Sequence, residues 1–523
     1  MSSTSAAAVP LSSRPAWYRD RFALGVAGAF CALATLCVAD HVMWRDEWPA
    51  FLTGRFATSL GEVFQESRVN GQPFFWYFSA WLLGKLPGYP WPLKIFHILI
   101  STTTTFLLVR TMPLARWQRV MLVFGYFLFY EYAVMVREHG PALLAIVVAS
   151  VAFIQPQRRP ILFGLALAAV FQMSLFNLAI GAALGLAYLF DVWRTRGTAG
   201  AKASAGGLLI GGAIAAASLA LTCWHVWPPA DAVNPYLNAA NFTSPERLPW
   251  AMSSVWRGCV PLRMAGLWNT NFLDFAMPAE VAVSWLLVAA VAVLSVRRPT
   301  ALVFYLLATV GVLATCVLIG PAQTRHQGQV FTVFVLTILM WFRTRESDFL
   351  GLARRWPRDV WIRWRKTFVT AILGIQVAAM ALAVTDERIR PLSGAKEAAE
   401  IIRQQVPPDL PVIGDTDNAM MALAGYLDRP VYVACRQEFG TFLKRDAKRG
   451  LEPLEGEELR RRVVAFSLAQ GRDVLLVVNY TVENPETQPM QVGKVWATIV
   501  MDERYEVYRI PYLAGAPAPP AAP

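Results

Sequence analysis

The chain has 523 residues, of which 55% are hydrophobic and only 16% are charged. Soluble domains carry about 25% charged residues, so this composition excludes an ordinary soluble protein and predicts a polytopic membrane protein. The net charge of +12 lies mostly in short loops between apolar runs, which indicates membrane topology and argues against a nucleic-acid partner.

A basic patch containing Arg14, Arg19 and Arg21 precedes the first apolar run, residues 22–42. The run is about twice as long as the apolar core of a secretory signal peptide. We therefore expect an uncleaved signal anchor that follows a cytoplasmic N-terminal tail, residues 1–21.

Hydrophobic runs predict an α-helical transmembrane domain over residues 22–385 with about eleven spans. Residues 160–190 are the least certain part, because they could form one long helix; the polar stretch FQMSLFN (171–177) favours a hairpin. The expected spans are 22–42, 93–109, 120–136, 141–155, 160–175, 176–190, 205–223, 280–296, 300–319, 327–342 and 367–385.

The positive-inside rule supports this count and the hairpin, because arginines and lysines then concentrate in every second loop. With the N-terminus in the cytoplasm, the two long outer loops are residues 43–92 and 224–279, and the C-terminal region is also outside. The apolar stretch 72–87 is too short for a full crossing. We expect it to form a juxtamembrane helix on the outer face, with Trp76, Tyr77 and Trp81 at the membrane interface.

Residues 386–512 alternate helix-like and strand-like segments, which predicts an extracytoplasmic α/β domain. They carry no glycine-rich phosphate-binding motif of the dinucleotide type. The tail 513–523, rich in alanine and proline, is expected to be disordered. The chain has six cysteines without a CxxC spacing, so neither a zinc knuckle nor a redox motif is predicted, and a Cys259–Cys435 disulfide stays undetermined. Helices are expected at 393–406, 416–427 and 455–471, strands at 411–415, 430–435 and 473–479, and a final hairpin from VWATIVM (495–501) and YEVYRI (505–510).

Ionisable residues converge on the predicted outer face. Each could be incidental: a solvated helix end, a headgroup contact, a snorkelling lysine or a satisfied buried histidine. Charges near hydrocarbon are nevertheless costly, and the topology brings all of them to one face independently, so we interpret them as a functional site. They are Asp46 and Glu47 after the first span, Lys94 and His97 in the second, Arg137, Glu138 and His139 after the third, and Arg325 and His326 before the tenth.

Carboxylates and arginines together suit transfer from a lipid-phosphate donor. A carboxylate can act as a general base toward a hydroxyl. A second carboxylate can orient the acceptor, or the pair Asp46 and Glu138 could hold a divalent cation, although the sequence requires none. Arginines bind phosphate through two parallel hydrogen bonds and stabilise the charge that develops on a leaving group.

The order of these motifs resembles the GT-C superfamily of polyprenyl-phosphate-dependent glycosyltransferases. The nearest type is family 39, which includes protein mannosyltransferases and the lipid A aminoarabinose transferase. The resemblance rests on RDEW (45–48) after the first span, NGQPFFWYF (70–78) before a juxtamembrane helix, VREHGP (136–141) after the third span, and a trailing outer domain. It covers most of residues 20–385 as architecture.

The resemblance implies that Asp46 is the catalytic base, with Glu47 beside it, and that Glu138 is the acidic residue of the second conserved loop. On the grounds of their charge, and not of the resemblance, we expect Arg137 and Arg325 to contact the donor phosphate. Two positions depart from the family pattern: Gln72, a further candidate substrate-binding residue, replaces a histidine, and Glu138 replaces the usual aspartate. Both departures concern the identity of the sugar and the acceptor more than the reaction class.

The resemblance thus implies an inverting glycosyltransferase in a bacterial inner membrane, with a membrane-lipid donor and a glycan, lipid or protein acceptor. Two alternatives stay open: a carrier or flippase for an anionic or lipid-linked solute, and a non-catalytic assembly subunit. A carrier is disfavoured because neither inverted hydropathy repeats nor paired broken helices at mid-membrane depth are evident.

Overall fold

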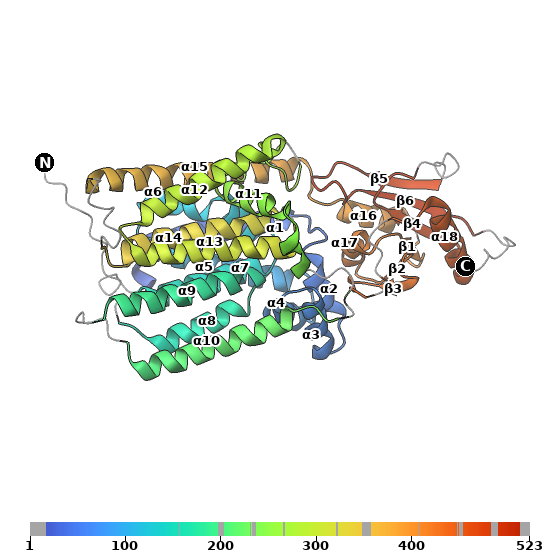
Figure 1. Ribbon diagram of the computed structural model, residues 1–523. Helices are drawn as coiled ribbons and strands as arrows, with labels where there is room; N and C mark the ends of the chain where they lie inside the picture. The colour runs from blue at the N-terminus through green and yellow to red at the C-terminus, as the bar shows by residue number, and fades with distance from the viewer. Residues whose placement is uncertain are drawn as a thin grey trace.

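A computed structural model shows a helical bundle with an α/β domain beyond one of its ends (Figure 1). We call the bundle end next to the α/β domain the domain end. Residues 17–155, 157–196, 203–230, 232, 237–264, 267–320, 323–347, 357–405, 407–446, 448, 453–482 and 490–512 are described. The predicted disordered tail 513–523 and most of the predicted N-terminal tail lie outside the described residues.

The bundle is that of a multi-pass membrane protein. Among the described residues, seven helices are long and apolar enough to cross a membrane. Two of the three shorter apolar helices within the described ranges, α7 and α8, pack against each other. The seven long helices are α1 (Arg21–Asp40), α5 (Trp91–Thr111), α9 (Leu175–Arg194), α10 (Ala205–Val226), α12 (Met277–Ser295), α13 (Pro299–Ile319) and α15 (Arg358–Ile389); these two shorter helices are α7 (His139–Phe153) and α8 (Pro160–Phe171).

The helix boundaries test the spans predicted in two stretches, 160–190 and 120–136. Residues 160–190 form the hairpin α8–α9, with a break at Gln172–Ser174. The segment predicted as a span over 120–136 is not one continuous α-helix, because α6 (Arg116–Val123) ends before Gly125 and a π-helical segment, η3 (Tyr126–Val134), follows. The hydrogen bond from Met135 N–H to Tyr130 O joins residues five apart, which is the spacing of a π-helix.

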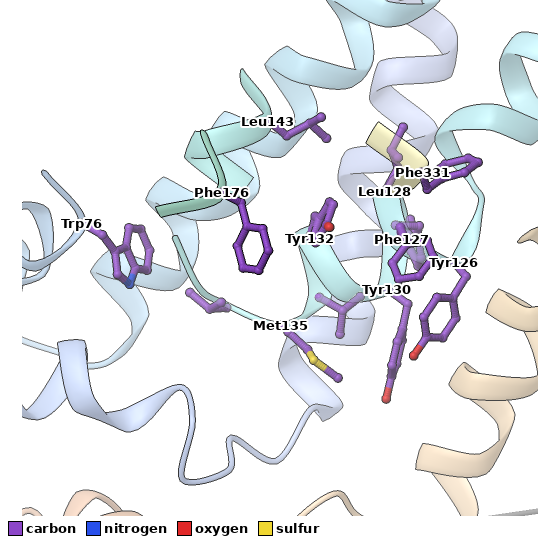
Figure 2. Packing of buried hydrophobic residues seen from close by; sticks show 14 of the residues in the cluster. Trp76, Tyr126, Phe127, Leu128, Tyr130, Tyr132, Met135, Leu143, Phe176 and Phe331 are labelled. Atoms are coloured by element: carbon purple, nitrogen blue, oxygen red, sulfur yellow. The ribbon is translucent and has the colours of Figure 1, made fainter. Parts of the chain in front are cut away.

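Segment η3 lies at the centre of the bundle and every residue in it is buried. Its aromatic rings pack against Phe331 of α14 (Thr324–Arg343) and lie near Phe176 of α9 (Figure 2). Almost all of α14 is buried as well. The bundle therefore has a protein-lined interior in which polar groups are screened from lipid.

The first long loop folds into three short helices at the domain end (Figure 1). The juxtamembrane helix predicted over residues 72–87 corresponds to α4, but Trp76 and Tyr77 are buried and not at an interface. Both rings lie inside because α4 packs on α2, α3 and α5. The short elements outside the long helices are η2 (Trp17–Arg19), α2 (Trp48–Phe56), α3 (Leu60–Val69), α4 (Phe74–Gly84), η4 (Ala239–Thr243), α11 (Arg247–Cys259) and η5 (Asp274–Ala276).

The C-terminal domain holds a six-stranded sheet in the order β3-β2-β1-β4-β6-β5. Strand β1 pairs in parallel with β2 and β4, whereas the β2–β3, β4–β6 and β5–β6 pairs are antiparallel. The final hairpin forms, but its first strand precedes the predicted 495–501 segment. The elements are α16 (Ala395–Gln405), β1 (Val412–Gly414), α17 (Asp417–Leu427), β2 (Val431–Val433), β3 (Glu438–Gly440), α18 (Gly456–Gln470), β4 (Val474–Val478), β5 (Gln491–Val495) and β6 (Tyr505–Ile510).

Helix α17 docks the domain onto α2. The ring of Tyr426 packs edge-on against Trp48, with 5.0 Å between centroids. A Cβ at Gly425 would lie 2.3 Å from the Trp48 ring, so only glycine permits this approach. Cys259 and Cys435 are both free thiols.

Candidate functional site

The loop between α1 and α2 is shaped by a short turn and a proline. Helix α1 ends where His41 adopts an extended conformation, and the Glu47 N–H then donates to Trp44 O (2.9 Å). Pro49 occupies the first turn of α2, where its missing N–H has no cost. Within this turn the side chains of Asp46 and Glu47 contact different partners.

Asp46 lies between two arginines from other parts of the chain. Its Oδ2 is 2.6 Å from Arg325 Nη1, in the first turn of α14, and 3.4 Å from Arg137 Nη1. The Asp46 side chain is 22% exposed, whereas that of Arg325 is 6% exposed. Asp46 is therefore the more accessible member of a mostly buried cluster.

Glu138 joins the same cluster through Arg137. Arg137 Nε lies 3.4 Å from Glu138 Oε2, and His139 Nε2 lies 3.7 Å from Glu138 Oε1. Asp46 and Glu138 therefore share one guanidinium group. The structure brings together five of the residues singled out from the sequence, which we call the Asp46 cluster: Asp46, Arg137, Glu138, His139 and Arg325.

The cluster holds both carboxylates in the ionised form. Burial opposes ionisation of Asp46, but the guanidinium groups of Arg325, Arg137 and Arg45 outweigh it and hold the pKa of Asp46 below its ordinary value. Burial likewise opposes ionisation of Glu138, and mainly Arg137 lowers the pKa of Glu138 to about 2. The arginine charges thus dominate the electrostatics of the cluster.

Arg137 is positioned by its backbone. His97 Nε2 lies 3.0 Å from the Arg137 carbonyl oxygen, so the imidazole donates to the backbone just where η3 gives way to α7. Gly140 completes this junction, because a Cβ there would lie 2.4 Å from His97 Nε2 and 2.9 Å from Tyr132 O. His97 therefore supports the cluster from behind and does not contact its carboxylates.

Glu47 contacts the protein interior. Its Oε1 accepts from the Val136 N–H (2.8 Å), and its Oε2 accepts from the Trp44 N–H (3.3 Å) and His41 Nε2 (2.6 Å). Its side chain is fully buried. Glu47 thus joins the first loop to Val136, the residue before Arg137, and this geometry suits positioning better than contact with a substrate.

A second carboxylate faces the other side of His41. His41 Nδ1 lies 2.5 Å from Glu387 Oε1 near the end of α15, and Tyr130 O–H donates to Glu387 Oε2 (2.7 Å). Burial opposes the charge, but Glu47 and Glu387 raise the pKa of His41 to about 10. His41 is thus an imidazolium between two carboxylates, which links α1, η3 and α15.

The sequence reasoning did not select His41, Glu387, Tyr130 or Arg263. His41 lies at the end of the first apolar run, five residues before Asp46. An ionisable residue at that position was the feature by which the sequence could have indicated it. Nothing in the sequence pairs it with Glu387. Arg263 lies under aromatic rings, 4.5 Å from the centroid of Trp268, and the Trp268 ring in turn contacts Trp44 (5.2 Å).

Three of the predicted residues lie beside the cluster or away from it. Lys94 Nζ donates to Val38 O (3.3 Å) at the start of α5. The His326 ring lies against Phe176, 5.0 Å between centroids, and 6.3 Å from the His139 ring. Gln72 lies in the turn between α3 and α4, where its N–H donates to Ser67 O (2.9 Å).

The loop that carries Asp46 also contacts the C-terminal domain. The Arg45 N–H donates to Glu503 Oε1 (2.9 Å), and its guanidinium pairs with Asp502. Ser393 O–H donates to the other oxygen of Glu503 (2.5 Å). Burial raises the pKa of Glu503 to about 7. The position of Asp46 therefore depends on both domains.

The arrangement suits an anion better than a cation. Within the described residues, no group of three or more His, Cys, Asp and Glu side chains is placed to hold a metal ion. The predicted pair Asp46 and Glu138 is separated by the guanidinium of Arg137, which would repel a cation. Metal binding by this pair thus finds no support in the geometry.

Comparisons with known proteins give weak similarity over nearly the whole chain. No protein-family model and no curated protein matches it. The crystal structure of ArnT from Cupriavidus metallidurans bound to undecaprenyl phosphate is 14% identical, with a TM-score of 0.45, over 95% of this chain and 99% of that one. The apo structure of ArnT is also 14% identical, with a TM-score of 0.46, over 93% and 98%.

Proposed function

We propose that this protein is a membrane glycosyltransferase that moves a sugar from a polyprenyl-phosphate donor to an acceptor hydroxyl. The observation that carries the proposal is the placement of Asp46 between Arg137 and Arg325, at the domain end of the bundle. This transfer needs a base for the acceptor hydroxyl and positive charge for the leaving phosphate. The accessible carboxylate supplies the first and the two guanidinium groups supply the second. The similar ArnT structure contains undecaprenyl phosphate, a lipid of the class that the proposed donor carries.

In the proposed reaction, Asp46 removes the proton from the acceptor hydroxyl as its oxygen attacks the anomeric carbon. The bond from the anomeric carbon to the phosphate oxygen breaks, and its electron pair leaves with the phosphate. Arg137 and Arg325 stabilise the charge on that leaving group. Attack opposite to the leaving group inverts the anomeric configuration.

In the free protein, Asp46 forms ion pairs with Arg137 and Arg325, the same arginines that would bind the donor phosphate. A bound phosphate takes a share of both guanidinium charges, so Asp46 becomes a stronger base when donor is present. The pKa of Asp46 lies below its ordinary value in the free protein because of those charges. Donor binding and base activation are therefore coupled through the same two side chains.

The remaining expectations belong to the same proposal. The basic loops favour a bacterial inner membrane with the N-terminus in the cytoplasm and the α/β domain outside. The acceptor is then a glycan, lipid or protein on the outer face. Glu138 orients Arg137 and the acceptor, while Glu47 holds the loop that carries Asp46.

The experiment compares Asp46→Asn with the unchanged protein in proteoliposomes. Undecaprenyl phosphate binding is measured by thermal shift, and transfer is measured from labelled undecaprenyl-phosphate pentoses and hexoses to envelope fractions. We expect the variant to lose about 10²- to 10⁴-fold in transfer and to bind undecaprenyl phosphate at least as tightly, because the competing carboxylate is gone. Near-normal transfer in this variant would remove Asp46 from the role of base. Movement of labelled lipid across the bilayer without transfer would support the carrier alternative instead.

A further inference from the structure

A cavity of about 260 Å³ lies between the first long loop and the C-terminal domain. One wall comes from Phe56 at the end of α2 and Glu62 in α3; the other comes from α17 and the segment after β3, including Phe442 and Lys444. None of the residues of the Asp46 cluster lines it. It is therefore a separate site, built by both domains.

The charges around this cavity disfavour an anion. Arg436 is bound by Asp417 (3.5 Å), Glu438 (2.8 Å) and Asp446 (2.8 Å), so its guanidinium charge is already neutralised. Three carboxylates line the cavity, from Glu62, Asp417 and Glu438, against the two cations of Arg436 and Lys444. A phosphate or carboxylate ligand would meet a slightly negative wall.

The lining also disfavours a lipid chain. Phe56, Met420, Met421 and Phe442 supply apolar surface, but charged groups lie between them. Lys444 Nζ lies 5.8 Å from the centroid of the Phe442 ring, so an aromatic face and a hydrogen-bond donor meet at one point. A ligand that complements this lining has an apolar face and an edge of hydroxyl or amino groups. A sugar ring has both features.

We propose that this cavity binds a neutral or amine-bearing sugar ring of the acceptor, so that the acceptor is a glycan or a glycolipid. The statement that the sugar belongs to the acceptor rests on the proposed function, whereas the binding of a sugar in this cavity does not. The C–H face of the ring packs on Phe442 and Phe56, and the carboxylates and Lys444 bind its polar edge. The volume is slightly below the range of about 300–1,000 Å³ for drug-sized ligands, which fits one ring of a longer chain.

Helix α2 connects this cavity to the candidate active site. It begins at Trp48, two residues after Asp46, and ends at Phe56 in the cavity wall. Nine residues at 1.5 Å each span about 13 Å. A glycan held in the cavity by one ring could therefore present the hydroxyl of another part of the molecule to Asp46.

The test measures sugar binding to the full-length protein in nanodiscs by saturation-transfer difference NMR. The probes are maltotriose as the neutral sugar, chitosan trisaccharide as the amine-bearing sugar and trigalacturonate as the acidic sugar. We expect signals from at least one of the first two and none from the third. Phe442→Leu should weaken binding about 2- to 12-fold, the contribution of an aromatic contact, and Phe442→Tyr should retain it. Phe242→Leu, which changes an exposed phenylalanine outside the cavity, should have no effect.

Lys444→Gln provides a second variant in case Phe442→Leu does not fold, with the exposed Lys396→Gln as its control. Lys444→Gln should weaken sugar binding, and Lys396→Gln should not. The inference is overturned if none of the neutral or amine-bearing probes binds, or if binding is unchanged by both Phe442→Leu and Lys444→Gln. Asp46→Asn should retain sugar binding, so binding without any transfer would reject only the proposed function. Transfer that depends on Asp46 without sugar binding would reject only this inference.

Discussion

Arg325 Nη1 lies 2.6 Å from Asp46 Oδ2 and joins the first turn of α14 to the loop after α1. This contact combines the base and the anion-binding group of the proposed reaction in one ion pair. Because Arg137 contacts the same carboxylate oxygen at 3.4 Å, the two arginines act on Asp46 together. Variants of Arg325 that remove or keep its charge separate the electrostatic effect of this arginine on Asp46 from its structural effect.

Arg325→Gln should move the acidic limb of the pH–rate profile to higher pH. Asp46 is ionised throughout the ordinary range because Arg325, its nearest cation, and Arg137 hold its pKa down against burial. Removing one guanidinium lets the pKa rise, so the base form is lost earlier as pH falls. Arg325→Lys keeps the charge and should leave the limb nearly in place. An unchanged limb in Arg325→Gln would show that Asp46 does not set it.

Glu47→Gln should destabilise the protein by about 1–3 kcal/mol, because it removes one of the two carboxylate partners of the buried His41 imidazolium and leaves Glu387 as the other. His41→Gln should be costly for the same reason. The double variant Glu47→Gln/His41→Gln should cost less than the sum of the two, since the Glu47–His41 interaction is then lost only once and Glu387 alone keeps an unmatched charge. Unfolding temperatures measure the cycle. Strict additivity would contradict the direct pairing of these residues.

Glu503→Gln should remove part of the pH dependence of stability. Burial raises the pKa of Glu503 to about 7 in the folded protein, against about 4.3 in an unfolded chain. The folded state therefore keeps the proton longer, so stability is highest below about pH 4.3, falls as pH rises toward 7, and is level above. We expect the unfolding temperature to fall less between pH 5 and pH 8 in Glu503→Gln than in the unchanged protein. Glu457→Gln, at an exposed carboxylate of α18, serves as the control and should keep the full slope.

Gly140→Ala should prevent normal folding or abolish transfer. The added Cβ would lie 2.4 Å from His97 Nε2 and 2.9 Å from the Tyr132 carbonyl oxygen, so the junction that positions Arg137 and Glu138 must shift. Gly28→Ala in α1 is the matched control, because a Cβ there has no heavy atom within 4 Å. Yield of folded protein and transfer rate report the effect. Wild-type behaviour of Gly140→Ala would contradict the close packing of His97 on this junction.

Several parts of the fold could be predicted because they depend on local patterns. Long apolar runs become helices wherever they occur, since backbone groups in lipid must be satisfied within the segment. The alternation after residue 386 likewise gave an α/β domain. The continuous helix expected over 120–136 does not form, because a π-helical segment follows Gly125 and its aromatic run is buried on all sides. Apolar composition alone does not distinguish a straight helix from such a segment.

The sequence by itself determined that Asp46, Arg137, Glu138 and Arg325 lie near one end of the bundle, because hydrophobic lengths and loop charges set which loops share a face. Only the tertiary structure decided which of the adjacent carboxylates Asp46 and Glu47 meets the arginines. Neighbouring residues in a turn have different partners: Asp46 contacts Arg325 of α14 and Arg137, whereas Glu47 contacts His41 and Val136. Contacts between segments so distant in the chain leave no periodic trace in the sequence, so the assignment required the packed structure.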